Sequence, residues 1–116
     1  MRFKIQGRLP NLNEYINACR TNKFVAAKMK RETEEMIMWQ IPKHEPFGKV
    51  KIHFTWIEPN MKRDKDNSAF AKKFILDALV KKGILPNDGW ENVEGFTDSF
   101  EIDKSNPGVI VEVENC

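Results

Sequence analysis

The chain has 116 residues and a mass of 13.5 kDa, a size typical of one domain. Hydrophobic residues make up 41% and charged residues 31%, as in ordinary globular proteins. The longest uninterrupted apolar runs have four residues, which excludes a transmembrane helix. We therefore expect a single domain over residues 1–116 with no membrane partner.

Charge is distributed unevenly along the chain. Residues 1–82 contain 18 lysines and arginines against nine aspartates and glutamates, whereas residues 83–116 contain one lysine against eight acids. Such an asymmetry favours a basic surface that meets a polyanion such as nucleic acid. Cys19 and Cys116 form neither a disulfide framework nor a metal quartet, and the N-terminus carries no signal-peptide pattern. A cytoplasmic protein is therefore expected.

The first half of the chain begins with alternating apolar residues that predict a short strand over residues 2–6. A short helix follows, capped by Asn11 or Asn13. Apolar residues at helical spacing then predict a long helix over residues 21–41, with Lys30 and Glu34 as a four-apart pair on its solvent side.

The second half begins with clean alternation over residues 49–58, which predicts a central strand. A helix over residues 67–82 ends at Gly83, and two strands follow over 92–102 and 109–113. The order β-α-α-β-α-β-β predicts an α/β (α+β) fold, in which two main helices pack on a mixed sheet of about four strands.

The segment Lys62–Asn67 carries the residues best suited to chemistry. Asp64 and Asp66 are two residues apart in extended chain leaving a strand, so their carboxylates project to the same side. They could share a divalent cation, because Mg²⁺ prefers one or two carboxylates plus water and phosphate oxygens. The basic residues between and before them would attract that phosphate. The alternative is that Asp66, Asn67 or Ser68 only caps the following helix, in a loop that is polar in any case.

Two more positions could complete such a site. At 100° per residue, Lys73 and Asp77 fall within ~20° of the direction of Asp66, whereas Lys72 points ~120° away. Lys73 is therefore better placed to reach a phosphate near Asp66, although it could simply form a surface pair with Asp77. Asp88 lies in an Asn-Asp-Gly turn, a composition that is also common in turns without chemistry.

Taken together, these motifs resemble the RusA family of Holliday-junction resolvases, small phage and prophage endodeoxyribonucleases. The residues that carry the resemblance are Arg63-Asp64-Lys65-Asp66-Asn67, a lysine on the next helix, Asp77-Ala78-Leu79, and Asp88 beyond Gly83. The resemblance covers nearly the whole chain in length and order of elements. It implies a RusA-like fold.

The same resemblance implies a homodimer that cuts four-way DNA junctions by paired, symmetric nicks in DNA recombination and repair. It implies Mg²⁺ as the cofactor, with Mn²⁺ as a substitute, and no small-molecule cofactor. Asp64, Asp66 and Asp88 match the metal-binding, catalytic acids, and Lys73 matches the catalytic lysine, with Lys72 as its rival. The residues expected to contact DNA are Lys62, Arg63, Lys65 and Lys72.

Two other functions are compatible with these residues. A non-catalytic DNA-binding phage accessory protein would keep the basic residues but need not keep all three acids. A metal-dependent enzyme that acts on a sugar nucleotide could use the same pair of aspartates. Such an enzyme usually needs a larger nucleotide-binding domain, and the chain has no Gly-rich phosphate loop.

Overall fold

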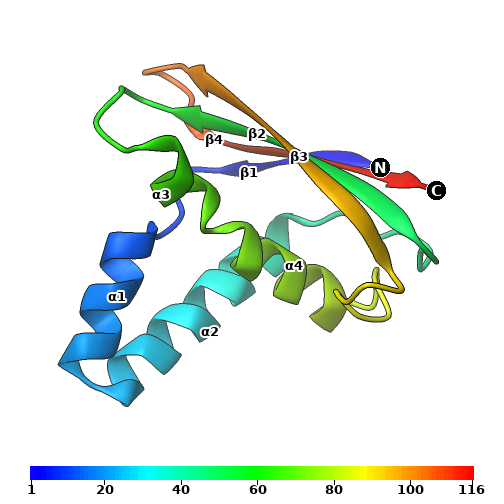
Figure 1. The fold of residues 1–116 in the computed structure, drawn as a ribbon, viewed down its shortest axis with the longest axis horizontal. Coiled ribbons are helices and arrows are strands. Elements are labelled where there is room, and N and C mark those ends of the chain that lie inside the picture. The colour runs from blue at the N-terminus through cyan, green and yellow to red at the C-terminus, as the bar shows by residue number, and fades with distance from the viewer.

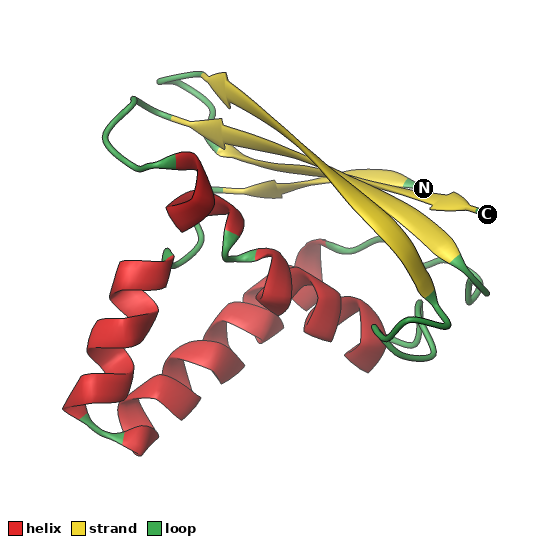
Figure 2. Ribbon diagram, viewed as in Figure 1, coloured by secondary structure: helices red, strands yellow, loops and turns green.

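The computed structural model describes all 116 residues and contains four strands and four helices. In chain order they are β1 (Arg2–Gln6), α1 (Leu12–Thr21), α2 (Lys23–Gln40), β2 (Val50–Glu58), α3 (Lys65–Ala69), α4 (Lys72–Lys81), β3 (Val93–Ile102) and β4 (Gly108–Asn115). The helices all lie on one face of the sheet, so the fold has two layers (Figures 1 and 2). The α+β class predicted from the sequence is confirmed.

The sheet is mixed, with the strand order β1-β4-β2-β3. β2 is antiparallel to β4 and parallel to β3, and α3 and α4 form the crossover between the two parallel strands. β2 is therefore central, as its clean alternation predicted. Because β2 and β3 run in parallel, their C-terminal ends lie at the same end of the sheet, where the chain continues from β2 toward α3.

The core lies between the sheet and the helices. From β2, Ile52 and Phe54 are buried, and from α4 Phe74, Ile75 and Leu79 are buried against them. This face of α4 is thereby fixed on the sheet, and Lys73 and Asp77 lie on the other side of the helix.

The single helix predicted over residues 67–82 is instead two helices. α3 ends at Ala69 and α4 begins at Lys72, with Phe70 in the turn between them. Backbone N–H groups in this turn bond to carbonyls three residues back rather than four. The interruption coincides with packing of the Phe70 ring against Tyr15 of α1, with centroids 5.4 Å apart. Angles predicted along one continuous helix therefore do not apply.

The prediction that Glu34 lies on the solvent side of α2 is wrong. Its side chain is 2% exposed and lies against α4, where Lys81 Nζ donates to the carboxylate. Lys30 Nζ lies 3.9 Å from Glu34 and 3.5 Å from Asp77 of α4. A buried carboxylate is tolerated here because cations from both helices surround it.

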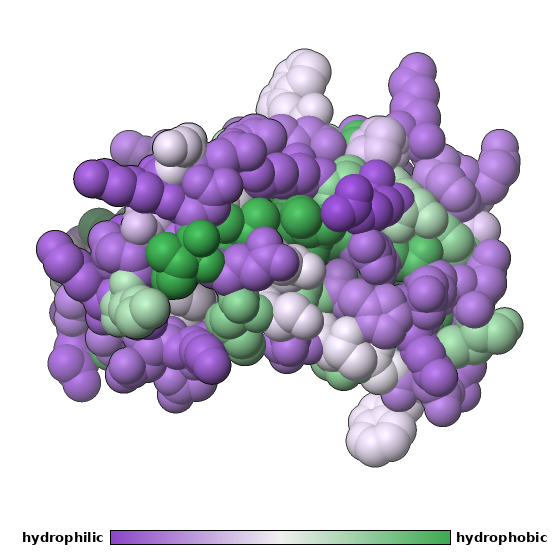
Figure 3. Space-filling view, turned by 90° about the horizontal axis from the view of Figure 1, so that it is seen from above, coloured by the Kyte–Doolittle hydropathy of each residue, from purple (hydrophilic) through white to green (hydrophobic).

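On the outer face of the sheet, opposite the helices, hydrophilic side chains flank a strip of hydrophobic ones (Figure 3). Polar contacts link neighbouring strands across it: Arg2 pairs with Glu112 at 2.8 Å, and the His53 ring bonds to Thr97 and Glu114. The apolar side chains of the sheet nevertheless point mainly toward the helices. None of the helices is both long and apolar enough to cross a membrane.

Candidate active site

Asp64 and Asp66 lie where the chain passes from β2 into α3 (Figure 1). Asp64 occupies the N-cap position of α3, but its side chain makes no capping hydrogen bond. Asp66 lies in the first turn and accepts a hydrogen bond from the backbone N–H of Asn67 at 3.0 Å. Both residues are exposed, and neither takes part in an ion pair of the chain. Their carboxylates are therefore free to bind a cation.

Asp88 lies in the turn after α4 and contacts a lysine of that helix. Lys73 Nζ lies 3.1 Å from Asp88 Oδ2 and 3.1 Å from Asp77 Oδ1. Hydrogen bonds to Asp77 first and Asp88 second raise the pKa of Lys73 above its ordinary value. The structure thus brings together two predicted site residues, Lys73 and Asp88. It also contains the pair of Lys73 with Asp77, which was the alternative that spacing alone favoured.

Lys72 points to a different place. Its ammonium donates to Asp98 of β3 at 2.9 Å and lies over two aromatic rings, the nearer of which is Phe96 at 4.9 Å. Lys72 is therefore bound to the sheet, whereas Lys73 faces the turn that carries Asp88. This arrangement favours Lys73 over Lys72 as the lysine of the candidate site.

A groove of about 280 Å³ opens between the segment 60–68 and β3; Lys65 lines it, whereas Asp64 and Asp66 do not. Trp56 and Phe100 line it, and Lys65 Nζ lies 5.5 Å from the centre of the Phe100 ring. Lys62 and Lys65 are exposed and pair with no carboxylate. Among the predicted DNA-binding residues, these two have charges that are not already neutralised within the protein.

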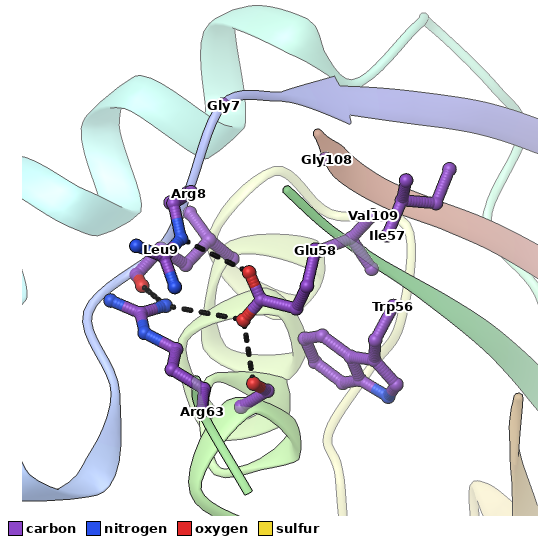
Figure 4. A pocket seen from close by; sticks show the side chains of 10 residues that line it. Gly7, Arg8, Leu9, Trp56, Ile57, Glu58, Arg63, Gly108 and Val109 are labelled. Carbon is purple, nitrogen blue, oxygen red and sulfur yellow. Dashed lines mark hydrogen bonds and ion pairs between the residues drawn. The ribbon is translucent and has the colours of Figure 1, made fainter. Parts of the chain in front are cut away.

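Arg63 also lines this groove, but its guanidinium is turned toward oxygens of the protein. Its side chain is 14% exposed, and its guanidinium donates to the backbone oxygen of Leu9 at 2.9 Å and to Glu14 at 2.5 Å. A third contact, at 3.6 Å, reaches Glu58 at the end of β2 (Figure 4). The positive charge of Arg63 is thus matched by two carboxylates of the same chain.

No three histidine, cysteine or acidic side chains lie close enough together within the chain to hold a metal ion. Asp64 and Asp66 nonetheless fit Mg²⁺ in their chemistry, since this ion takes one or two carboxylates and completes its shell with water and phosphate oxygens. Asp88, the third predicted acid, stands on a separate element and is paired with Lys73. The structure does not bring it into a cluster with Asp64 and Asp66.

Sequence reasoning did not single out Asp98 or Glu58. Asp98 stands between Phe96 and Phe100 on the inward side of β3 and accepts a hydrogen bond from Trp56 Nε1 at 2.8 Å. The sequence does contain a signal for Asp98, because its charge interrupts the apolar residues that alternate along one face of this strand. Glu58 has a side chain that is 12% exposed, yet it is the last residue of a strand, a position where surface glutamates are common, and no local signal marks it.

No protein-family model matches the sequence, and no match was found among curated proteins. The side chains of this chain and their geometry thus carry the functional assignment.

Proposed function

We propose that the protein is a Mg²⁺-dependent endodeoxyribonuclease that resolves four-way DNA junctions by paired, symmetric nicks. The main support is the contact between Lys73 and Asp88, two predicted site residues that α4 and a turn separate in sequence. A second support is that Asp64 and Asp66 keep exposed carboxylates without an ion-pair partner. On this proposal the three acids hold the metal and Lys73 acts beside it.

Cleavage of a phosphodiester requires a nucleophilic water and neutralisation of charge that develops on the phosphate. When bound, Mg²⁺ lowers the pKa of its water and polarises the phosphate. Asp64 and Asp66 supply the oxygen ligands that this ion prefers. Lys73 carries a positive charge at neutral pH, as lysines ordinarily do, and its two carboxylate partners raise its pKa further. On this proposal its ammonium passes from Asp88 to a phosphate oxygen and stabilises the transition state.

Lys62 and Lys65 are the first candidates for contacts with DNA phosphates, because their ammonium groups are unpaired. Such contacts bind the backbone without reading base sequence, as recognition of a branched shape requires. Lys72 would reach a phosphate only by leaving Asp98. An enzyme of this kind works in the cytoplasm, where the exposed thiols of Cys19 and Cys116 stay reduced.

Paired nicks are explained most simply by a homodimer, since a two-fold symmetric protein matches a four-way junction with one active site on each side. We expect a particle of about twice 13.5 kDa in sedimentation equilibrium at micromolar concentration. Detection of monomer alone, both with and without DNA, would contradict the dimer.

A second candidate function is DNA binding without cleavage. It is favoured by one observation, namely that the three acids do not form a cluster within the chain. Such a protein would use Lys62 and Lys65 in the same way and would not respond to divalent metal ions.

The deciding experiment incubates the protein with a synthetic four-way junction and with a linear duplex of the same sequence. The proposal expects symmetric nicks in the junction only, with Mg²⁺ or Mn²⁺ present, and none with a chelator. The matched control is Lys73→Met, which should bind the junction and leave it intact. Binding by the unaltered protein with no nicks under any condition would instead support the second candidate.

A further inference from the structure

The chain around Asp64 and Asp66 is tied down on both sides. On one side, Arg63 bonds to the backbone of Leu9 and to the carboxylate of Glu14. On the other side, Asn67 Oδ1 accepts a hydrogen bond from the backbone N–H of Asn13 at 3.1 Å. The two candidate metal ligands thus stand between two residues that both bond to the segment 9–14.

Glu58 ties the end of β2 to the same region (Figure 4). Its carboxylate accepts hydrogen bonds from Arg8 Nε at 3.0 Å and from Ser68 Oγ at 2.6 Å, and it lies 3.6 Å from Arg63. Ser68 belongs to α3, so one buried carboxylate joins β2, α3 and the segment after β1. Glu58 is thus held by two arginines and a hydroxyl group of the protein.

We propose that Arg63, Glu58 and Asn67 are positioning residues that fix Asp64 and Asp66 for metal binding, and that Arg63 does not contact DNA. This inference rests on the proposed function, because it assigns the two aspartates to a metal. The physical reason is that outer partners set the orientation of metal ligands, and their loss typically lowers metal affinity or activity by about 10- to 100-fold.

The competing role for Arg63 is a direct phosphate contact, and the geometry is against it. A guanidinium that binds phosphate needs free donors facing solvent. Here the side chain is 14% exposed, and both terminal nitrogens already face protein oxygens. The neighbouring Lys62 and Lys65 show the opposite arrangement, since each is exposed and unpaired.

Two measurements separate the roles. The first is the salt dependence of junction binding in Ca²⁺, a condition chosen to hold the junction uncleaved. Loss of one phosphate contact lowers the slope of log K against log salt by about one. The second is the affinity for Mn²⁺ without DNA, followed by electron paramagnetic resonance. Variants are Arg63→Ala and Glu58→Gln, with Lys65→Ala as a phosphate-contact control.

Because Glu58 is nearly buried and its variant could fold poorly, Glu14→Gln provides a second test on a half-exposed partner of Arg63. Glu112→Gln serves as the matched control, since Glu112 also pairs with an arginine but stands on β4, on the outer face of the sheet. Arg63→Ala, Glu58→Gln and Glu14→Gln should keep the salt slope and weaken Mn²⁺ binding, about 10-fold or more for the first two. Lys65→Ala should lower the slope, and Glu112→Gln should change neither.

The proposal is overturned if Arg63→Ala lowers the slope by about one while Glu58→Gln and Glu14→Gln leave Mn²⁺ binding unchanged. If the unaltered protein binds no Mn²⁺, the proposed nuclease function fails. Amide hydrogen exchange then tests separately whether Arg63 and its partners hold the segment that carries Asp64 and Asp66. Amides of residues 64–66 should exchange at least several-fold faster in Arg63→Ala and Glu14→Gln than in Glu112→Gln. Equal exchange rates in all the variants would overturn the positioning role as well.

Discussion

Lys73 Nζ lies 3.1 Å from Asp88 Oδ2, although α4 and the following turn separate the two residues in sequence. The lysine also holds Asp77 at 3.1 Å, so one ammonium lies between two carboxylates. In this arrangement the charge of Asp88 is neutralised by the protein itself. A cation that binds Asp88 through Oδ2 competes with Lys73, and a released Lys73 ammonium becomes available to an anionic substrate.

The first prediction concerns the protonation of Lys73. Its pKa is raised above 10.5, chiefly by the hydrogen bond to Asp77 and then by that to Asp88. The stabilising pair is therefore fully present below pH 10.5 and is lost as the pH rises through the higher folded-state value. Nuclear magnetic resonance titration of the Lys73 side chain should place its midpoint above that of an unpaired lysine. Asp77→Asn should lower the midpoint more than Asp88→Asn, and the reverse order would contradict the assignment.

The second prediction separates Lys73 from Lys72. Lys73→Met should lower junction cleavage about 100-fold or more, because it removes a positive charge directed at the phosphate. It should leave stability nearly unchanged, since the side chain is 59% exposed. Lys72→Met should instead lower the free energy of unfolding by about 1 kcal/mol, because the ammonium packs on aromatic rings and pairs with Asp98. Urea unfolding and a junction-cleavage assay distinguish the two outcomes.

Local sequence signals predicted most elements of the fold. The alternation over β2 identified a central strand. Gly83 ends the helical segment as predicted, with a φ of +78° that glycine adopts readily. The break at Phe70 could not be predicted in this way. No proline or glycine stands there, and its packing partner Tyr15 lies far earlier in the chain.

The candidate site was predictable only in part. Spacing alone offers the four-apart pair of Lys73 with Asp77, whereas the place of Asp88 in the site was implied by the family resemblance and not by the helix or turn pattern. The inward turn of Arg63 depends on Glu14 and Leu9, which belong to a distant part of the chain. A basic residue beside two acids suggests a DNA contact when only its neighbours in sequence are considered.

The third prediction tests the buried charge of Glu34. Lys81→Met leaves the Glu34 carboxylate with Lys30 alone, at 3.9 Å, and should lower the free energy of unfolding by about 2 kcal/mol. The expected loss is smaller than the 3–5 kcal/mol typical when one partner of a fully buried ion pair is removed, because water reaches the position of Lys81. The double variant Glu34→Leu/Lys81→Met should recover most of the loss, since no uncompensated charge remains. If the double variant is no more stable than Lys81→Met, the carboxylate is not the source of the cost.

The fourth prediction concerns the two aspartates before α3. Asp64→Asn and Asp66→Asn should each abolish cleavage of a four-way junction, because an amide is a poorer Mg²⁺ ligand than a carboxylate. Binding of the junction should be retained or tighter, because repulsion between carboxylate and phosphate is relieved. Thermal unfolding should change little, since neither side chain joins an ion pair and an amide oxygen at position 66 can still accept the hydrogen bond from the Asn67 N–H. Gel-shift and cleavage assays measure the first two effects, with Glu112→Gln as a control that alters a carboxylate on the opposite face of the sheet. Full cleavage by both single variants would rule out a metal site at this position.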